Sequence, residues 1–376
     1  MKSFKLYPEI LTFDKCEEFC SKFNINKNDL IITNEYIYKP FFEAFIKDAT
    51  IIYRRDFGSG EPSDVMVEKI YNQVKNIDYK RVIGIGGGSI LDVAKLFALE
   101  QITPVCDLFE KKFEPVKNKE LILIPTTCGT GSEVTNISVL HLSSINSKLG
   151  LAHDEILADY AVLIPELLKV LPFKVFAASS IDALIHAIES FVSPKASVFT
   201  EMYSVESMKM ILNGFKNIVV NRKDDLNNLL YDFLIASTYA GIAFGNAGTG
   251  AVHAMSYPLG SVYHVPHGEA NYVCFTEIFK TYKKLNPNGK IKRLNNILVE
   301  ILNCSEEEVF EELEKLLYKI LPKKSLKGYG ATEEDLLLFT DNVLTKQGRL
   351  MSNAYVTLDR DTIYNIYKTL YKKIRT

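Results

Sequence analysis

The sequence predicts an α/β domain with a parallel, Rossmann-like sheet over residues 1–177, followed by an all-helical domain over residues 178–376. Three observations predict this fold class. Short, continuous apolar runs alternate with amphipathic helical patterns in the first part, which is typical of parallel strands buried on both faces. Glycine-rich or threonine-rich turns follow two of these runs. Beyond the boundary, strand-like runs give way to long helical patterns.

Five segments of the first domain are predicted as strands, because each is a short apolar run that ends in turn residues. They are "DLIITN" (29–34), "ATIIYR" (49–54), "RVIGIGGGS" (81–89), "ELILIPTT" (120–127) and "YAVLIP" (160–165). The segment "DVMVEKIYNQVKN" (64–76) has the apolar spacing of an amphipathic helix. In the second domain the same spacing predicts long helices over 179–192, 201–219, 228–244, 306–321 and 361–374.

Composition narrows the possible partners and the compartment. A net charge of −2 gives no electrostatic reason to expect nucleic acid. No apolar run approaches the ~20 residues needed to cross a bilayer, and "MKSFKLYPEI" lacks the apolar core of a secretion signal. The six cysteines lack paired spacing, which indicates reduced thiols. We therefore expect a cytoplasmic protein with neither a nucleic-acid nor a membrane partner.

The stretch "RVIGIGGGSILDVAK" runs from an apolar strand through Gly87, Gly88 and Ser89 into a helix. Consecutive glycines let the backbone approach a bulky anion, and the free amides at the start of the next helix point at it. The pattern is not a full GxGxxG, and a tight turn without a ligand is the alternative.

A second loop, "LILIPTTCGTGSEVT", follows another apolar strand and offers Thr126 and Thr127. Two small-residue loops at the ends of adjacent strands are what a dinucleotide needs at the edge of an open sheet. The alternative is that the threonines and serines only cap the next helix. The pair of loops favours a dinucleotide-binding site more strongly than either loop alone.

Four side chains form a candidate metal site. Asp182 and His186 are spaced i, i+4 in "SSIDALIHAIESFV" and therefore leave the same helix face, with Glu189 one turn on as a possible supporting partner. For this helix alone, a local hydrogen-bonded pair is an alternative. His253 lies in a helical pattern, and His267 stands between a proline and a glycine. One carboxylate and three imidazoles without a thiolate favour Fe²⁺ or Zn²⁺ over calcium.

These segments resemble the signatures of a known family, the iron-containing (group III) alcohol dehydrogenases. The segments are "GGGSILDVAK", "PTTCGTGSEVT", "DALIHAIE" and "AVHAMSYPLGSVYHVPHG", and the resemblance covers essentially the whole chain. It implies the two-domain fold shared with dehydroquinate synthase. It also implies NAD as cofactor, with NADP as the alternative, and a catalytic Fe²⁺, with Zn²⁺ as the alternative.

The resemblance also assigns roles to residues. It implies that Asp182, His186, His253 and His267 hold the metal, so that His264 is not a ligand. It further implies that the glycine-rich loop approaches the pyrophosphate. Four residues are then expected on the nicotinamide and ribose side: Thr126, Thr127, Thr135 and Lys148.

This chain departs from the family pattern at three positions. Tyr257 stands where many members have a histidine, so either Tyr257 or His264 is the candidate for passing the substrate proton to water. Asn34 replaces an aspartate that often selects NAD over NADP. Glu61 stands where many members have asparagine, and its carboxylate is a candidate replacement for the missing negative charge.

The wording "TNEYIYKPF", "GEPSDVM" and "YPLGSVYHVPHGEANY" resembles members that interconvert succinate semialdehyde and 4-hydroxybutyrate. The expected reaction is hydride transfer from the reduced nicotinamide to an aldehyde whose oxygen the metal polarises. A small-molecule substrate with a distal carboxylate and a homodimer are expected. One alternative is a dehydrogenase of another short alcohol or a diol, of the butanol type. A more remote alternative is a lyase similar to dehydroquinate synthase, which uses NAD and zinc.

Overall fold

The computed structural model describes residues 3–58, 60–221 and 226–372, and it divides into two compact units. The first unit is Leu6–Leu171, and the second is the chain from Pro172 onward together with the segment before Leu6. The boundary predicted at 177/178 falls inside a helix that begins at Phe173, whereas the division lies at 171/172. The difference arises because this helix extends the predicted 179–192 segment toward its N-terminus.

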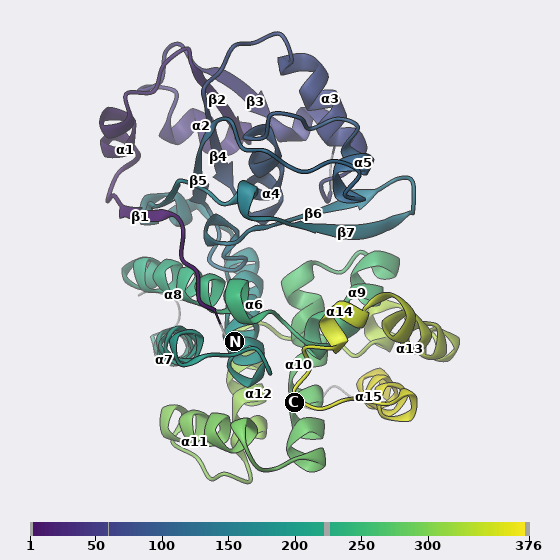
Figure 1. Cartoon of the computed structure of the whole chain (residues 1–376). Coiled ribbons are helices and arrows are strands. Elements are labelled where there is room, and N and C mark those ends of the chain that lie inside the picture. Colours follow the sequence, from purple (N-terminus) through teal and green to yellow (C-terminus); the bar gives the residue numbers. More distant parts are fainter. Residues whose placement is uncertain (1–2, 59, 222–225, 373–376) are drawn as a thin grey trace. The chain divides into compact units, whose positions relative to one another are not determined.

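The α/β unit holds a parallel sheet of six strands (Figure 1). The predicted strands are all present as β2 (Asp29–Thr33), β3 (Thr50–Tyr53), β4 (Arg81–Gly86), β5 (Glu120–Pro125) and β8 (Tyr160–Leu163). A sixth strand, β1 (Glu9–Thr12), adds an edge, and the order is β1-β8-β5-β4-β2-β3. The carboxyl ends of β4 and β5 lie side by side because Gly86 pairs with Pro125.

Both faces of the sheet are covered by helices, as a doubly wound fold requires. On β2, Leu30 and Ile32 join a core with α3 (Asp64–Val74), α4 (Gly88–Phe97) and α5 (Val105–Phe109). Ile31, between them, joins a core with α1 (Cys16–Phe23) and α2 (Glu35–Phe41) on the opposite face. This two-sided burial explains why the strands read as continuous apolar runs.

Two further strands form an antiparallel hairpin outside the main sheet, β6 (Ile137–Leu142) and β7 (Ser147–Ala152). Neither was predicted. Buried and half-buried residues alternate along β6, so it lacks the continuous apolar run that marks the parallel strands.

The second unit is helical, as predicted. Its helices are α6 (Phe173–Val192), α7 (Val198–Val220), α8 (Leu226–Ala247), α9 (Ala251–Tyr263), α10 (His267–Leu285), α11 (Lys290–Leu302), α12 (Val309–Ile320), α13 (Glu333–Lys346), α14 (Gly348–Met351) and α15 (Arg360–Lys372). Helix α6 packs against α7, α8 and α10 (Figure 1). By length and composition α6 could cross a membrane, but 83% of its apolar stretch is buried inside the protein, as in a core helix.

Candidate metal centre and cofactor loops

Helix α6 presents two of the predicted ligands. Asp182 and His186 are one turn apart, and both are buried although they are polar. His186 also stacks on Phe244 of α8, with ring centroids 4.3 Å apart. Polar side chains on such a buried helix need partners, because an unpaired buried polar group costs free energy. Helix α6 therefore contributes two buried polar side chains to a site inside an otherwise apolar helical bundle.

Two glycines allow α9 and α10 to approach α6 closely. A Cβ on Gly250, just before α9, would lie 3.3 Å from the Glu189 side chain of α6. A Cβ on Gly268, the second residue of α10, would overlap the backbone carbonyl of Ala178. Because these positions lack side chains, the first turns of α9 and α10, with His253 and His267, pack directly on α6.

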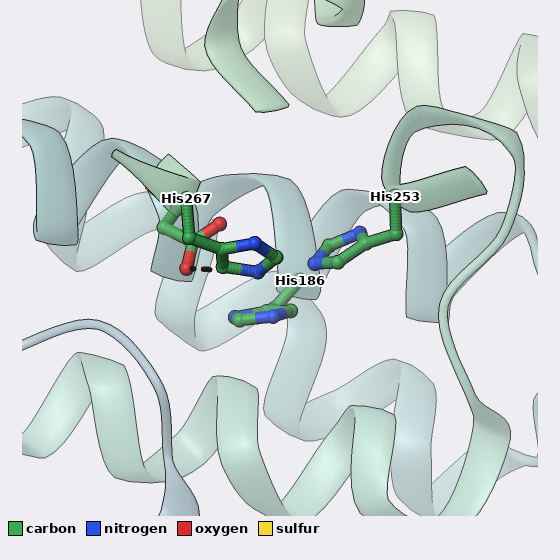
Figure 2. A group of neighbouring side chains, drawn as sticks. His186, His253 and His267 are labelled. Atoms are coloured by element: carbon green, nitrogen blue, oxygen red, sulfur yellow. Dashed lines mark ion pairs between the residues drawn. The ribbon is translucent and has the colours of Figure 1, made fainter. Parts of the chain in front are cut away.

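The four predicted side chains converge. One ligand atom from each of Asp182, His186, His253 and His267 lies within 4.8 Å of the other three. The imidazole of His253 lies 4.7 Å from that of His186 and 5.4 Å from that of His267, between ring centroids. Figure 2 shows the three rings turned toward one another. The Nε2 of His267 is 3.9 Å from Oδ2 of Asp182. Three helices thus bring together residues that are far apart in the sequence.

Two further side chains, Glu189 and Asn271, hold ligands of this cluster in place. Glu189 Oε2 lies 2.5 Å from Nδ1 of His253, and its Oε1 accepts a hydrogen bond from the backbone N–H of Val252. Asn271, one turn after His267, donates from Nδ2 to Oδ1 of Asp182 at 2.7 Å. The supporting role expected for Glu189 therefore falls on His253 rather than on its own helix neighbour His186. Asn271 was not predicted, although its i+4 spacing from His267 in "HGEAN" was the available signal.

The charge state of the cluster suits a cation. Burial pushes the pKa of Asp182 upward, but the three imidazoles and the Asn271 hydrogen bond outweigh it and lower that pKa. The carboxylate is therefore ionised at neutral pH. Burial disfavours a charged His253, while the Glu189 hydrogen bond raises the pKa of its imidazole.

The donor set fits a borderline divalent ion. His253 Nε2 is buried and has no hydrogen-bond partner among the described residues. Because Glu189 accepts the proton on Nδ1, Nε2 presents a lone pair to the centre. A lone pair left unpaired inside a protein is costly unless a metal takes it. One carboxylate and three imidazoles are ligands that Fe²⁺ or Zn²⁺ accepts.

The two candidates for proton transfer lie in different surroundings. Tyr257 is one turn after His253 on α9, and its ring centroid is 6.3 Å from that of His267. His264 ends α9 in the left-handed conformation, with φ of 54°. Its side chain is exposed and makes no hydrogen bond or ring contact within the described ranges. The structure therefore brings Tyr257, but not His264, beside the cluster.

In the α/β unit, the predicted glycine loop connects β4 to α4. Gly87 is the N-cap of α4, Gly88 begins the helix and Ser89 is exposed. A Cβ on Gly88 would lie 2.7 Å from Cγ2 of Thr130 in the second loop, so the two loops touch only because position 88 has no side chain. The backbone N–H of Thr126 donates to Gly86 O at 3.0 Å. Thr126 is buried and Thr127 half-buried.

A buried lysine holds these two loops together. Lys95 of α4 is fully buried, and its Nζ donates to Ser132 Oγ at 2.8 Å and to Ile137 O at 2.6 Å. It also reaches Thr135 Oγ1 at 3.4 Å, so the predicted cofactor residue Thr135 lies inside this network. Asp92 accepts from Ser132 Oγ at 2.6 Å. Neither Asp92 nor Lys95 was predicted as a functional residue from the sequence.

The remaining predicted cofactor residues lie at two places. Asn34 follows β2 as the N-cap of α2, is 6% exposed, and its Oδ1 has no partner among the described residues. Its Nδ2 donates to the Tyr36 hydroxyl at 3.2 Å. Glu61 and Lys148 form an ion pair at 2.6 Å. The Glu61 carboxylate suggested as a replacement charge is therefore already paired with Lys148.

Comparison with known proteins gives one match within each of the two compact units. The family described as iron-containing alcohol dehydrogenase matches residues 9–165, and its C-terminal part matches residues 176–371. The chain is 52% identical to 4-hydroxybutyrate dehydrogenase of Clostridium kluyveri, covering 99% of this chain and 100% of the relative. It is 35% identical to long-chain-alcohol dehydrogenase 1 of Geobacillus thermodenitrificans, covering 83% and 80%.

A solved structure has the same fold. It is sulfoacetaldehyde reductase from Bifidobacterium kashiwanohense in complex with NAD⁺, with a TM-score of 0.87, 22% identity and complete coverage of both chains.

Proposed function

The chain belongs to the iron-containing alcohol dehydrogenase family, and from this premise we propose that it interconverts succinate semialdehyde and 4-hydroxybutyrate with a nicotinamide cofactor and a divalent metal. The observation that carries the proposal is the convergence of one carboxylate and three imidazoles on one point. The substrate is taken from the Clostridium kluyveri relative, which is 52% identical over nearly the whole chain.

Asp182, His186, His253 and His267 would hold the metal, with Fe²⁺ as the expected ion and Zn²⁺ as the alternative. When bound, the ion supplies a Lewis acid that polarises the aldehyde oxygen and stabilises the negative charge that develops there.

The surrounding residues prepare this site. Glu189 keeps the proton of His253 on Nδ1 and so directs the Nε2 lone pair into the centre. Asn271 holds one oxygen of Asp182 with its amide and leaves the other oxygen facing His267. Both partners are buried, so the geometry of the site is set before substrate binds.

The two loops of the α/β unit are the proposed cofactor site, with NAD favoured and NADP as the alternative. Gly87, Gly88 and Ser89 would receive the pyrophosphate at the start of α4, where free backbone N–H groups favour an anion. The nicotinamide and ribose side is assigned to Thr126, Thr127 and Thr135, and the adenosine ribose to Asn34. Glu61 and Lys148 are also proposed cofactor residues, and because they pair at 2.6 Å they would contact the same part of the cofactor. The unpartnered Oδ1 of Asn34 supports a hydrogen bond with a ribose hydroxyl.

Tyr257 is the proposed route for the substrate proton. Its ring stands beside that of His267, whereas His264 is exposed at the end of α9. The phenol would hold the proton at its oxygen and exchange it with water.

The proposal extends to the setting in which the enzyme acts. We place it in the cytoplasm, as a homodimer that uses small aldehydes and alcohols. Light scattering on the purified protein measures the oligomeric state, and fractionation of cells measures the compartment.

The experiment that tests the function measures oxidation of NADH and NADPH with succinate semialdehyde after loading with Fe²⁺ or Zn²⁺. The expected result is metal-dependent turnover, with kcat/KM higher on succinate semialdehyde than on butanal. A preference for butanal would assign the chain to the butanol type instead. No turnover of any aldehyde by the metal-loaded protein would overturn the dehydrogenase assignment.

A further inference from the structure

The cofactors NADH and NADPH differ only in a phosphate on the 2′-oxygen of the adenosine ribose. A site that admits this phosphate needs a cation, and it must lack an unpaired carboxylate that would repel the phosphate. Resting on the cofactor site proposed above, we propose that Arg55 binds the 2′-phosphate of NADPH, so that the enzyme uses NADPH as well as NADH.

Arg55 and Asn34 lie at one corner of the parallel sheet, where β2 and β3 end. The two strands are parallel neighbours, and their last residues, Thr33 and Tyr53, pair with each other (Figure 1). The chain leaves β2 at Asn34, the proposed ribose contact, and it leaves β3 in a short 3₁₀ turn, Arg54–Phe57. Because the carboxyl ends of neighbouring parallel strands meet at one edge, the segment that carries Arg55 starts beside Asn34.

The side chain of Tyr36 connects Asn34 with Arg55. Its hydroxyl accepts a hydrogen bond from Nδ2 of Asn34 at 3.2 Å. The guanidinium of Arg55 lies over the ring of the same tyrosine, with Cζ 4.8 Å from the ring centroid. A cation over an aromatic face is attracted by the negative charge of that face. Arg55 is therefore held at this corner, one aromatic side chain away from Asn34, although it is exposed.

The positive charge at this corner has no acidic partner. Among the described residues, neither Arg54 nor Arg55 makes an ion pair, even with the adjacent Asp56. The acidic side chains that follow Asn34 and Gly60 in the chain already have lysine partners, in the pairs Glu35–Lys39 at 2.5 Å and Glu61–Lys148 at 2.6 Å. An anion that enters the corner therefore meets guanidinium groups that are not neutralised.

Two buried polar atoms that follow β2 and β3 also lack a partner. They are Oδ1 of Asn34 and Nε of Arg54, on side chains that are 6% and 7% exposed. The Nη2 of Arg54 donates to the carbonyl oxygen of Gly60, which fixes the chain after β3. Unpaired buried polar atoms are costly and point to a missing partner. A phosphorylated ribose supplies both kinds of partner, because its 3′-hydroxyl donates and its phosphate oxygens accept.

A guanidinium suits this task because its planar fork matches a phosphate and donates two parallel hydrogen bonds. A phosphate monoester carries about two negative charges at neutral pH, so the contact is charge-assisted. NADH has a hydroxyl at the same position and leaves Arg55 stacked on Tyr36. The neutral amide of Asn34 repels neither cofactor. Arg55 would thus contribute to NADPH binding without weakening NADH binding.

The test measures the dissociation constants of NADP⁺ and NAD⁺ by titration calorimetry on the metal-loaded protein, without an aldehyde and without turnover. The unaltered protein should bind NADP⁺ within about 10-fold of NAD⁺. Arg55→Gln is expected to raise the dissociation constant of NADP⁺ by about 10- to 100-fold and to leave that of NAD⁺ within about twofold. Arg55→Lys should recover part of the loss. Lys39→Gln is the matched control, because it removes an exposed positive charge of α2 that already pairs with Glu35.

Each other outcome has a defined meaning. An unchanged NADP⁺ constant in Arg55→Gln overturns the proposal, and so do equal losses for both dinucleotides, which indicate a structural role. An equal loss of NADP⁺ affinity in Lys39→Gln overturns it as well, because net charge then explains the effect. If the unaltered protein binds NAD⁺ but not NADP⁺, only the role of Arg55 fails; if it binds neither, the proposed function fails with it. Binding of both dinucleotides without reduction of any aldehyde would contradict the proposed function and still support Arg55.

Discussion

The metal centre and the cofactor loops are built in opposite ways. In the helical unit, four side chains supply the atoms that meet, and their buried partners Glu189 and Asn271 set the orientation. In the α/β unit, the loops meet because Gly88 has no side chain, and the groups offered to a ligand are backbone N–H groups. The first site is therefore sensitive to losing a side chain, and the second to gaining one.

Each site is also held in place by one buried charged side chain. At the metal centre a buried carboxylate, Glu189, fixes an imidazole. At the loops a buried cation, Lys95, ties α4 to the second loop, and burial lowers the pKa of its amine. The contrast predicts that substitutions separate into those that change metal content and those that change cofactor affinity.

The largest effect is expected from His267→Ala. Removing one of four ligands should cost metal content together with several kcal/mol of transition-state stabilisation, on the order of 10³-fold in kcat/KM. Elemental analysis and kinetics on the same preparation measure both. An unchanged rate with an unchanged metal content would remove His267 from the site.

A smaller effect is expected from Glu189→Gln. The neutral amide keeps the shape but loses the charge that orients His253, so metal affinity should fall by about 10- to 100-fold. Competition with a chelator measures the affinity. Glu300→Gln, an exposed position on α11, is the matched control and should match the unaltered protein. Equal affinity in both variants would mean that Glu189 does not support the metal.

Gly88→Ala should act at the other site. The new Cβ would meet Thr130 at 2.7 Å, which pushes the two loops apart and is expected to raise KM for NADH about 10-fold. Metal content should stay at the level of the unaltered protein. Gly150→Ala is the control, because its Cβ would meet the nearest atom at an ordinary 3.8 Å. Loss of metal in Gly88→Ala would show that the two sites are not independent of each other.

The smallest effect is expected from Asn34→Asp. A carboxylate at this position repels a 2′-phosphate and accepts from the ribose hydroxyls of NAD. The ratio of kcat/KM with NADH to that with NADPH should rise roughly 5-fold. An unchanged ratio would mean that the adenosine ribose lies away from Asn34.

The sequence predicted the parallel core and the metal cluster, for identifiable reasons. Strands such as β4 are buried on both faces and carry continuous apolar runs, which are easily recognised. The i, i+4 spacing of Asp182 and His186 places both on one face of a helix, whatever that helix packs against. Segment 251–270 added His253 and His267, whose meeting with α6 depends on contacts far apart in the chain, and the family resemblance then implied that all four residues hold the metal.

The features that were missed depend on the folded structure. Strand β6 alternates buried and half-buried residues, β7 is mostly half-buried or exposed, and β1 is a short, half-exposed edge. Lys95 reads as a surface lysine on a helix, and only the folded chain shows it fully buried against Ser132. Likewise, the pairing of Glu61 with Lys148 joins residues that no local pattern connects.

Anomalous diffraction from crystals of the Fe²⁺-loaded protein tests the central claim most directly. The account predicts a single strong peak at about 2.0–2.2 Å from a carboxylate oxygen of Asp182 and from one nitrogen each of His186, His253 and His267. A peak elsewhere in the chain, or one that leaves any of these four side chains beyond bonding distance, would contradict it.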